Sequence, residues 1–399
     1  MAARAASLSK RGRSIPASPI RKLAPFADAA KARGTRIYHL NIGQPDIETP
    51  TCIRERLKTI DDRVLAYSPS TGSPEYLHTL QRYYQRRLGL ELTTGQILAT
   101  TGGSEAILFS LMACADEGDD VLVVEPFYAN YRTFAAMAGV TIVPITSRGN
   151  DGFHLPPRQT WERALTPRTR AVLLCNPNNP TGTVYTSEEL AMVARFCRER
   201  ELFLISDEVY RDFVYDGRKA VSALDLAGCE ALVIVVDSLS KRYSACGIRL
   251  GALVTRNATI FDSCLRMAQG RLSPPGLAQM IAVGADSLGA DYFTGVVAEY
   301  QRRRDVLFEG LSSIPGVFLP RPEGAFYCVA KLPVESADDF AAWLLTDFDY
   351  QGATVMVAPA NGFYASDLGR SEIRIAYVLN EEDLRAAVRI LGKALRIRR

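Results

Sequence analysis

The sequence VIVVDSLSKRYSACGIRLG, at residues 233–251, joins an apolar run to a polar turn that contains one lysine. The run Val233–Val236 is typical of a buried strand. Lys241 then stands among small and hydroxylated residues, in a chain with 8 lysines and 39 arginines. A desolvated lysine close to another positive charge, here Arg249, becomes a usable amine nucleophile for a carbonyl. The stretch therefore indicates Schiff-base chemistry at Lys241.

The same turn has the groups that a phosphate needs. Ser238 and Ser240 supply hydroxyls just before the lysine, and Arg249 supplies a guanidinium after it. These groups can bind phosphate oxygens beside the amine. A phosphate-bearing aldehyde cofactor would satisfy both halves of the stretch. The alternative from these residues alone is a strand, a polar turn and a surface lysine.

Length and composition are those of an ordinary globular chain. Its 399 residues are enough for two domains, and 47% hydrophobic and 23% charged residues are typical values. A net charge of +3 is too small to indicate nucleic acid or membrane partners, and no apolar window reaches the length of a membrane span. The cysteines form no CxxC pair and the histidines have no metal-ligand spacing. We therefore expect a cytoplasmic protein with reduced cysteines and no metal.

Predicted strands and helices alternate along the first part of the chain. Apolar strand runs at 97–101, 121–125, 171–175, 202–206 and 233–236 are each followed by a polar loop. Helical patterns separate most of these runs. The alternation predicts an α/β fold with a mostly parallel, doubly wound sheet, whose ligands bind at the carboxyl ends of the strands.

A change of pattern divides the chain. Beyond a long charged helix that begins near residue 290, strands and helices alternate in an α+β manner rather than as β/α units. We expect an N-terminal arm at 1–45 that joins a smaller domain, a large domain at 46–289 and the smaller domain itself at 290–399. Within the arm, residues 1–14 are predicted to lack regular structure.

Two glycine-containing turns can bring backbone N–H groups to a ligand. The strand at 97–101 runs into Gly102, Gly103 and Ser104 and then into a helix, whose N-terminus can bind an anion through its free N–H groups. Gly43 stands in a turn after a short strand and can approach a ligand closely. A βα turn without a ligand and a plain turn are the respective alternatives.

Three polar residues lie at or just after predicted strand ends. Asp207 ends a strand, and a buried carboxylate there needs a cation such as a protonated pyridine nitrogen; a cap or turn is the alternative. Tyr210 can hydrogen-bond a phenolate oxygen or belong to the core. Asn179 lies in the turn NPNNPTG, which favours Asn for backbone reasons of its own.

Two further side chains also have a functional and a structural interpretation. Tyr128 can stack on a flat ring or simply pack in the core. Arg374 alternates with Ile373, Ile375 and Tyr377 in a strand pattern, so it lies among small and apolar neighbours on the other face. An arginine there needs a carboxylate, either of a substrate or of a structural salt bridge.

The combination of these features resembles the pyridoxal-phosphate aminotransferases of fold type I, the aspartate aminotransferase superfamily, and especially its class I/II members. The resemblance extends from about Ile15 to the C-terminus, and its most specific motifs are Asn176–Gly182, Asp207–Tyr210 and the S-x-S-K spacing within Ser238–Gly251. It implies a large α/β domain and a smaller α+β domain, pyridoxal 5'-phosphate (PLP) as the cofactor, and a homodimer with shared active sites.

The resemblance also implies a role for each residue. Lys241 would hold the cofactor as a Schiff base, the internal aldimine, and then move a proton between substrate and cofactor. Asp207 would keep the ring nitrogen protonated, and Tyr210 completes the expected catalytic set. The other expected cofactor contacts are Gly103, Ser104, Tyr128, Asn179, Ser238, Ser240, Arg249 and, from the neighbouring subunit, Tyr67. The expected substrate contacts are Gly43, Asn179, Arg374 and Arg271. Arg271 would bind a distal carboxylate or, alternatively, pair within the dimer interface.

The expected function is transamination between an L-amino acid and a 2-oxo acid, with an aspartate-like or glutamate-like donor if Arg271 binds substrate. The same cofactor apparatus also serves elimination or replacement, cyclisation, decarboxylation and oxidation, so these reactions stay open. A cofactor-sensing regulator is a third interpretation, but the roughly 40 residues before Gly43 are too short for a DNA-binding module. Substrate choice is expected to depend on loops around Ile20, Gly43, Tyr67 and Arg271.

Overall fold

The computed structural model describes residues 7–19 and 21–398 of the chain. Ile20, near which one substrate loop is expected, lies outside the described residues. The strands are β1 (Arg36–His39), β2 (Ile97–Thr100), β3 (Asp120–Glu125), β4 (Thr141–Thr146), β5 (Thr169–Cys175), β6 (Phe203–Asp207), β7 (Val233–Ser238), β8 (Gly251–Val254), β9 (Tyr327–Lys331), β10 (Ala353–Met356), β11 (Ala358–Pro359) and β12 (Glu372–Ala376). The α-helices are α1 (Lys10–Ser14), α2 (Ala24–Ala32), α3 (Thr51–Arg56), α4 (Pro74–Leu88), α5 (Gly102–Cys114), α6 (Asn130–Ala138), α7 (Arg158–Ala164), α8 (Ser187–Glu199), α9 (Leu239–Arg242), α10 (Ala258–Arg271), α11 (Gly276–Ala282), α12 (Ala290–Ser312), α13 (Ala337–Thr346) and α14 (Glu381–Ile397).

The largest sheet has seven strands in the order β2-β8-β7-β6-β5-β3-β4. Its strand pairs are parallel except for the two that β8 makes with β2 and β7. This confirms the expected α/β fold with a mostly parallel, doubly wound sheet. Because β8 alone runs in the opposite direction, the carboxyl ends of the other strands share one edge, and β8 begins at that edge.

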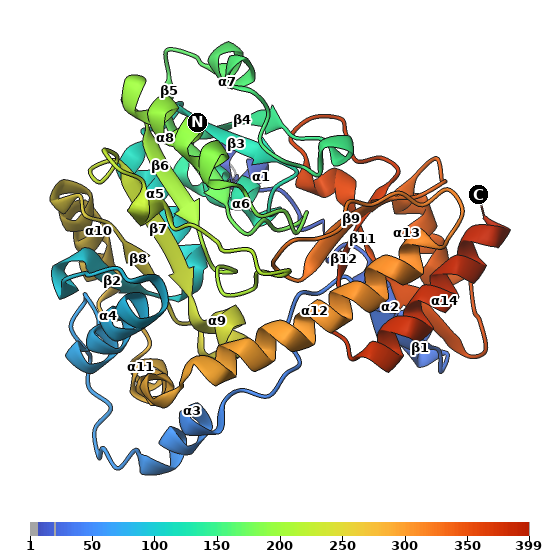
Figure 1. Cartoon of the computed structure of the whole chain (residues 1–399), viewed down its shortest axis with the longest axis horizontal. Helices are drawn as coiled ribbons and strands as arrows, with labels where there is room; N and C mark the ends of the chain where they lie inside the picture. The colour runs from blue at the N-terminus through green and yellow to red at the C-terminus, as the bar shows by residue number, and fades with distance from the viewer. Residues whose placement is uncertain (1–6, 20, 399) are drawn as a thin grey trace, which may run out of the picture.

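Apolar side chains cover both faces of this sheet. In β3, Val121 and Val123 belong to one core while Leu122 and Val124 belong to the other, as the two-residue period of a strand requires. Helices α5, α6 and α10 contribute to the first core, and α4, α8 and α11 contribute to the second. Figure 1 shows helices on both sides of the sheet. The edge where the parallel strands end is therefore supported from both faces.

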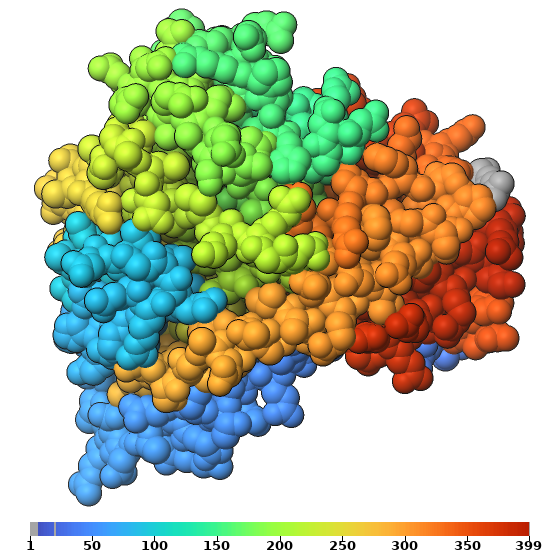
Figure 2. All heavy atoms as spheres, viewed as in Figure 1, coloured from blue at the N-terminus to red at the C-terminus, as the bar shows by residue number. Residues whose placement is uncertain are grey.

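A second group of strands lies at the other end of the molecule. An antiparallel sheet has the order β11-β12-β9, and β1 pairs in parallel with β10. The 23-residue helix α12 runs from the large sheet to this group, and its atoms form the orange band along the front in Figure 2. Buried residues of β9, β12 and α14 continue the first core, so the two groups of strands share one hydrophobic interior.

The structure has one more helix near the N-terminus than the sequence predicts. The sequence predicts no regular structure for residues 1–14, but Lys10–Ser14 form the short helix α1. Ser9 caps this helix, because its hydroxyl accepts a hydrogen bond from the Gly12 N–H at 2.9 Å. A single serine cap is a weak signal in a segment rich in Arg and Ser, which explains the difference.

Across residues 7–19 and 21–398, no helix has the length and apolar character that a membrane crossing needs.

Candidate active site

A cavity of about 700 Å³ opens at the carboxyl edge of the large sheet. The loops after β2, β3, β5, β6 and β7 form one side of it, and β12 with the segment after β1 contributes to the other. Most of the residues singled out in the sequence line this cavity: Gly43, Gly103, Ser104, Tyr128, Asn179, Asp207, Tyr210, Ser238, Ser240, Lys241, Arg249 and Arg374. The parallel strands explain this convergence, because their carboxyl ends lie side by side.

Lys241 lies in the short helix α9, directly after β7. Ser238 caps this helix, since its hydroxyl accepts a hydrogen bond from the Ser240 N–H at 3.2 Å. The Lys241 Nζ donates to the Gly43 carbonyl oxygen at 2.9 Å and lies 3.7 Å from the Cys246 Sγ. Among the residues that the structure describes, no acid pairs with this amine, so the amine is free to meet a ligand in the cavity.

The start of α5 forms a cradle of positive potential. Gly103 and Ser104 lie in the first turn of this 13-residue helix, whose free N–H groups and dipole favour an anion. A Cβ placed on Gly102 would lie 2.7 Å from the Arg249 Nη2, so the guanidinium lies over the start of the helix. The hydroxyls that precede Lys241 line the same cavity. Backbone N–H groups, hydroxyls and a guanidinium are the donors that a phosphate group binds.

Asp207 ends β6 and is buried at the cavity wall. The Tyr131 hydroxyl donates to its Oδ2 at 2.6 Å, and the Val209 N–H donates to its Oδ1 at 3.4 Å. Burial raises the pKa of Asp207 to about 6, and these two hydrogen bonds limit the rise. Ionising this carboxyl group is therefore costly unless a cation comes close to it.

Tyr131 is a site residue that the sequence interpretation missed. It lies in α6, three residues after Tyr128, and the two rings meet edge to face with their centroids 5.5 Å apart. Tyr128 lines the cavity, and the Asn130 Nδ2 donates to its hydroxyl at 2.8 Å. The helical spacing of the two tyrosines was the available signal. Their polar partner could not be foreseen, because Asp207 is 76 residues away in the chain.

Tyr210 and Asn179 lie side by side on another wall of the cavity. The Asn179 Nδ2 donates to the Tyr210 Oη at 3.4 Å, and the Tyr210 Oη lies 3.0 Å from the Tyr327 Oη. Burial raises the pKa of Tyr210, so its hydroxyl stays protonated and can donate. Tyr327, from β9, gave no signal in the sequence. A Cβ on Gly43 would lie 1.8 Å from the Tyr327 Oη, so this position needs glycine.

Arg374 comes from β12 and is almost fully buried beside the cavity. Its guanidinium donates to the Asn41 carbonyl oxygen and, at 3.4 Å, to the Asn179 Oδ1. The ring centres of Tyr327 and Phe363 lie 4.8 and 4.9 Å from its Cζ. Burial lowers the pKa of Arg374, and its Nε has no partner in the described part of the chain. A buried cation without a carboxylate favours an anionic ligand.

Two predicted residues lie outside the cavity lining. Tyr67 is 80% exposed on the loop before α4. Arg271, at the end of α10, donates to the carbonyl oxygens of Ser70 and Ala99 at 3.3 Å and lies 3.4 Å from a carboxylate oxygen of Glu105. Arg271 was expected to bind a distal substrate carboxylate or, alternatively, to pair within the dimer interface. In this chain its Nη2 is linked to the two carbonyl oxygens, while its Nε and Nη1 form no hydrogen bond with the described residues.

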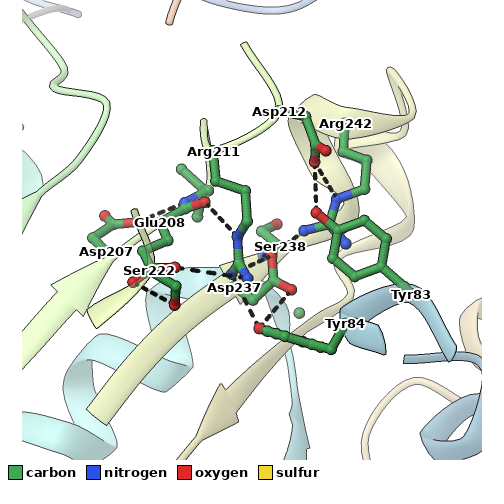
Figure 3. Close-up of polar contacts among 12 residues, drawn as sticks. Tyr83, Tyr84, Asp207, Glu208, Arg211, Asp212, Ser222, Asp237, Ser238 and Arg242 are labelled. Atoms are coloured by element: carbon green, nitrogen blue, oxygen red, sulfur yellow. Dashed lines mark hydrogen bonds and ion pairs between the residues drawn. The ribbon is translucent and has the colours of Figure 1, made fainter. Parts of the chain in front are cut away.

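Charged side chains buried behind the cavity hold the helix that contains the lysine (Figure 3). Arg242, the residue after Lys241, pairs with Asp237 and, at 3.1 Å, with Asp212. The Tyr83 hydroxyl donates to Asp212 at 2.7 Å, and the Arg242 Cζ lies 3.7 Å from the centre of the Tyr83 ring. These contacts fix the four-residue helix α9 on the end of β7.

The same network reaches the neighbour of Asp207. Arg211 lies 3.4 Å from a carboxylate oxygen of Asp237 and 3.7 Å from one of Glu208. Burial alone would raise the pKa of Asp237, but the positive charges of Arg211 and Arg242 lower it. The ends of β6 and β7 are thus linked by ion pairs, which fixes the position of the lysine relative to the aspartate.

Comparisons with known proteins agree with one another. A family model described as aminotransferase class I and II matches residues 35–391. The chain is 32% identical to the aspartate/prephenate aminotransferase of Thermus thermophilus, over 91% of this chain and 93% of the relative. It is 31% identical to the probable aspartate/prephenate aminotransferase of Aquifex aeolicus, over 95% and 96%. Among solved structures, the alanine aminotransferase from Pyrococcus furiosus has a TM-score of 0.90 at 28% identity, over 98% of this chain and 100% of that chain.

Proposed function

This chain belongs to the class I and II aminotransferase family and is a transaminase, and from that premise we propose that it works with PLP held at Lys241. Members of the family generally depend on PLP. One observation carries the proposal: a single cavity holds the Lys241 amine, the Asp207 carboxylate and the Arg374 guanidinium, and none of them pairs with an opposite charge among the described residues. PLP and an amino acid supply the partners that these groups lack.

The phosphate end of PLP fits the start of α5. The backbone N–H groups of Gly103 and Ser104 would bind phosphate oxygens, together with the hydroxyls of Ser238 and Ser240. Arg249 would add a guanidinium, which is suited to two parallel hydrogen bonds with a phosphate. Among the described side chains that line the cavity, Asp207 and Asp28 are the only acids, so these donors have no further anion of the protein to bind.

The ring of PLP fits the opposite part of the cavity. Asp207 would bind the protonated ring nitrogen, a cation that offsets the cost of ionising this buried carboxyl group. Asn179 and Tyr210 would bind the ring hydroxyl, and Tyr128 would cover one face of the ring. These roles are proposals that rest on the cavity lining and on the polar contacts described above.

The chain's own residues then do specific work in transamination. When bound, PLP supplies an aldehyde that accepts an amino group and a ring that takes up the electrons released at the substrate Cα. Arg374 binds the substrate carboxylate and so orients the Cα–H bond. The Lys241 Nζ takes the proton from Cα as a general base. The Gly43 carbonyl oxygen, 2.9 Å from Nζ, keeps the amine on the substrate side of the cavity.

We propose a dicarboxylic amino donor and a 2-oxo acid acceptor. Two relatives are named aspartate/prephenate aminotransferases, and aspartate carries a second carboxylate. The α-carboxylate has a partner in Arg374. The second carboxylate needs a separate cation, and Arg271 does not line the cavity of this chain.

The cofactor proposal can be tested with the purified protein. PLP should give a visible absorbance band, and borohydride should fix its mass on the peptide that contains Lys241. Aspartate should change the visible spectrum, and a 2-oxo acid should restore it. Lys241→Ala, the matched variant, should bind PLP without covalent attachment. A peptide map that shows PLP on a different lysine, or on none, would refute the assignment of Lys241.

We also propose that two copies form the working enzyme. Val64, Leu65 and Tyr67 are 77%, 61% and 80% exposed. Their loop projects together with α3 at the lower left of Figures 1 and 2. Exposed apolar side chains this close together favour an interface. A second copy of the chain is the simplest partner, because in a symmetric dimer the same loop of each copy would be covered. Tyr67 would then reach the partner's phosphate site, as the family resemblance implies.

The proposed division into an arm at 1–45, a large domain at 46–289 and a small domain at 290–399 is supported by the two groups of strands. The seven-stranded sheet falls within 46–289, and β9 to β12 fall within 290–399. The strand β1, from the arm, pairs with β10. The cavity then lies where the three parts meet, because Gly43, Lys241 and Arg374 come one from each.

A further inference from the structure

One wall of the cavity is formed by the N-terminal segment of the chain. From α2, Ala24, Ala27, Asp28 and Lys31 line the cavity at the helical spacing of a single face. At 1.5 Å per residue this face is about 10 Å long. Arg21, just before the helix, lines the same cavity. The wall therefore carries two cations and one acid.

The basic residues of this segment divide into two sets. Lys22 pairs with Asp338 on the side of α13, and the Arg33 guanidinium donates to the Leu345 carbonyl oxygen at 2.8 Å. These two face away from the cavity and are engaged. Arg21 and Lys31 line the cavity, and their side chains have no hydrogen bond or ion pair with any residue in 7–19 or 21–398. The free cations are those on the cavity side.

Pro19, which precedes Arg21 by two residues, packs beside the expected binding site of the substrate α-carboxylate. This proline packs on Gly362, where a Cβ would lie 2.2 Å from the proline ring. The next residue is Phe363, whose ring centre is 4.9 Å from the Arg374 Cζ. Pro19 is therefore fixed next to the pocket of Arg374, and Arg21 lines the same cavity.

The other cations of the cavity already have proposed partners. Lys241 and Arg249 belong to the PLP site, and Arg374 belongs to the α-carboxylate. Burial lowers the pKa of His39, so this residue adds no positive charge at neutral pH. Among the described residues that line the cavity, this leaves Arg21 and Lys31 for an anion at the far end of a substrate.

We propose that Arg21 binds the distal carboxylate of a dicarboxylic substrate and so determines substrate specificity. This inference rests on the proposed function. A guanidinium can form two parallel hydrogen bonds with a carboxylate, whereas the Lys31 ammonium adds only a nearby positive charge. Asp28, on the same wall, repels an anion and lowers the affinity that Arg21 provides. Specificity thus comes from the N-terminal segment of the same chain and not from Arg271.

The test compares Arg21→Gln with Lys22→Gln, its neighbour on the engaged side. Binding of succinate and of propionate to the PLP-loaded enzyme is measured by calorimetry, which does not depend on turnover. Arg21→Gln should weaken succinate binding about 10- to 100-fold, as expected for a hydrogen-bonded charge pair, and should leave propionate within about twofold. Lys22→Gln should change neither. Asp28→Asn should strengthen succinate binding.

The kinetic counterpart is the ratio of kcat/KM for aspartate to that for alanine. Arg21→Gln should lower this ratio by a similar factor, mainly through KM for aspartate. An unchanged ratio together with unchanged succinate binding refutes the role of Arg21 while the transaminase function stands. A larger loss in Lys31→Gln than in Arg21→Gln also refutes it. If the PLP-loaded protein transaminates no amino acid at all, the proposed function and this inference both fail.

Discussion

A single buried carboxyl group, that of Asp207, shows how function costs stability in this chain. Asp207 is enclosed at the end of β6, where burial raises its pKa to about 6. The Tyr131 hydroxyl supplies one strong hydrogen bond, but no cation among the described residues pairs with the charged form. Before PLP binds, the ionised group is therefore unfavourable, and the cofactor's ring nitrogen is the cation that reverses this.

Asp207→Asn should stabilise the PLP-free protein near neutral pH while abolishing transamination. The folded pKa of about 6 lies above the ordinary value of 3.8, so the Asp207 contribution to stability is full below pH 3.8 and is lost as the pH rises through about 6. The difference between these two pKa values corresponds to at most about 3 kcal/mol in the free energy of unfolding. Urea unfolding should show the gain of the Asn variant growing between pH 4 and pH 7. Asp62→Asn, at an exposed acid, is the control, and a gain independent of pH would contradict the expectation.

Gly43→Ala should disrupt the site by displacing the Tyr327 ring. The new Cβ would lie 1.8 Å from the Tyr327 hydroxyl, and that ring is held by Tyr210 and by Arg374. We expect a loss of about 1–3 kcal/mol in the free energy of unfolding and a weaker affinity for PLP, measured by fluorescence titration. Gly295→Ala, where a Cβ meets nothing within 4 Å, should not weaken PLP binding. Equal PLP affinity in Gly43→Ala and Gly295→Ala would contradict this expectation, because the Tyr327 ring would then move aside without disturbing the site.

At the scale of strands and helices, the sequence predicted the α/β fold and the sites that follow parallel strands. Lys241, Asp207 and Asn179 each come soon after an apolar run, and parallel strands bring such ends to one edge. That inference needs only the order of elements along the chain. It requires no knowledge of which side chains touch.

The residues that the sequence did not predict depend on contacts between distant segments. Tyr327 meets Tyr210 across 117 positions, and Tyr131 meets Asp207 across 76. No local pattern encodes such pairs. Arg271 illustrates the opposite case, because its loop is expected to contact substrate although the residue does not line the cavity of this chain. Loop residues have no periodicity that would indicate which way they face.

His154 links α8 to the segment before β9 through contacts that depend on pH. The His154 Nδ1 lies 3.0 Å from a Glu189 carboxylate oxygen, and its Nε2 lies 3.6 Å from one of Glu323. Hydrogen bonds to Glu189 and then to Glu323 raise the pKa of His154 to about 10. The histidine is therefore charged across the ordinary pH range, and each glutamate has a cationic partner there.

His154→Gln should destabilise the fold at pH 7 by about 1 kcal/mol, a small value because the ring is partly exposed. The folded pKa of about 10 lies above the ordinary value of 6.5, so this stabilisation is full below pH 6.5 and is lost as the pH rises through about 10. Thermal unfolding of variant and wild type should therefore converge above pH 10. His78→Gln, at an exposed position of α4, should match the wild type throughout. Because the folded pKa is about 10, a difference in thermal stability that persists at pH 10.5 or above would contradict the ion-pair explanation.

At the scale of the whole molecule, the cavity depends on parts that are far apart in the chain. Lys241 follows the large sheet, Arg374 belongs to the small antiparallel sheet, and Gly43 follows the strand that pairs with β10. The helix α12 spans the two groups of strands (Figure 1). Any relative movement of the two groups would change the distance between the amine and the guanidinium, and so would alter the fit of a substrate.

Mixed dimers should show whether the active sites are shared. Lys241→Ala chains lack the amine, and Tyr67→Ala chains would lack the donor that each gives to its partner's phosphate site. When the two variants are mixed and allowed to exchange subunits, half of the random dimers contain one site with both residues intact. Activity should therefore rise to about a quarter of the wild-type value, as the two-fold symmetry of a dimer dictates. Activity that stays at the sum of the separate variants would mean that Tyr67 acts within its own chain or not at all.

The reversed direction of β8 has a consequence for how this chain can vary in length. The chain leaves the sheet edge after Ser238, passes Lys241 and Arg249, and re-enters at Gly251, which pairs with Ser238 itself. The covalent anchor and the phosphate's guanidinium are therefore carried on one closed loop whose two ends are hydrogen-bonded together. A residue inserted or deleted here cannot be absorbed by the flanking strands without shifting one group relative to the other. Among relatives, gaps should accumulate in the projecting loop around Val64 and be absent between Ser238 and Gly251.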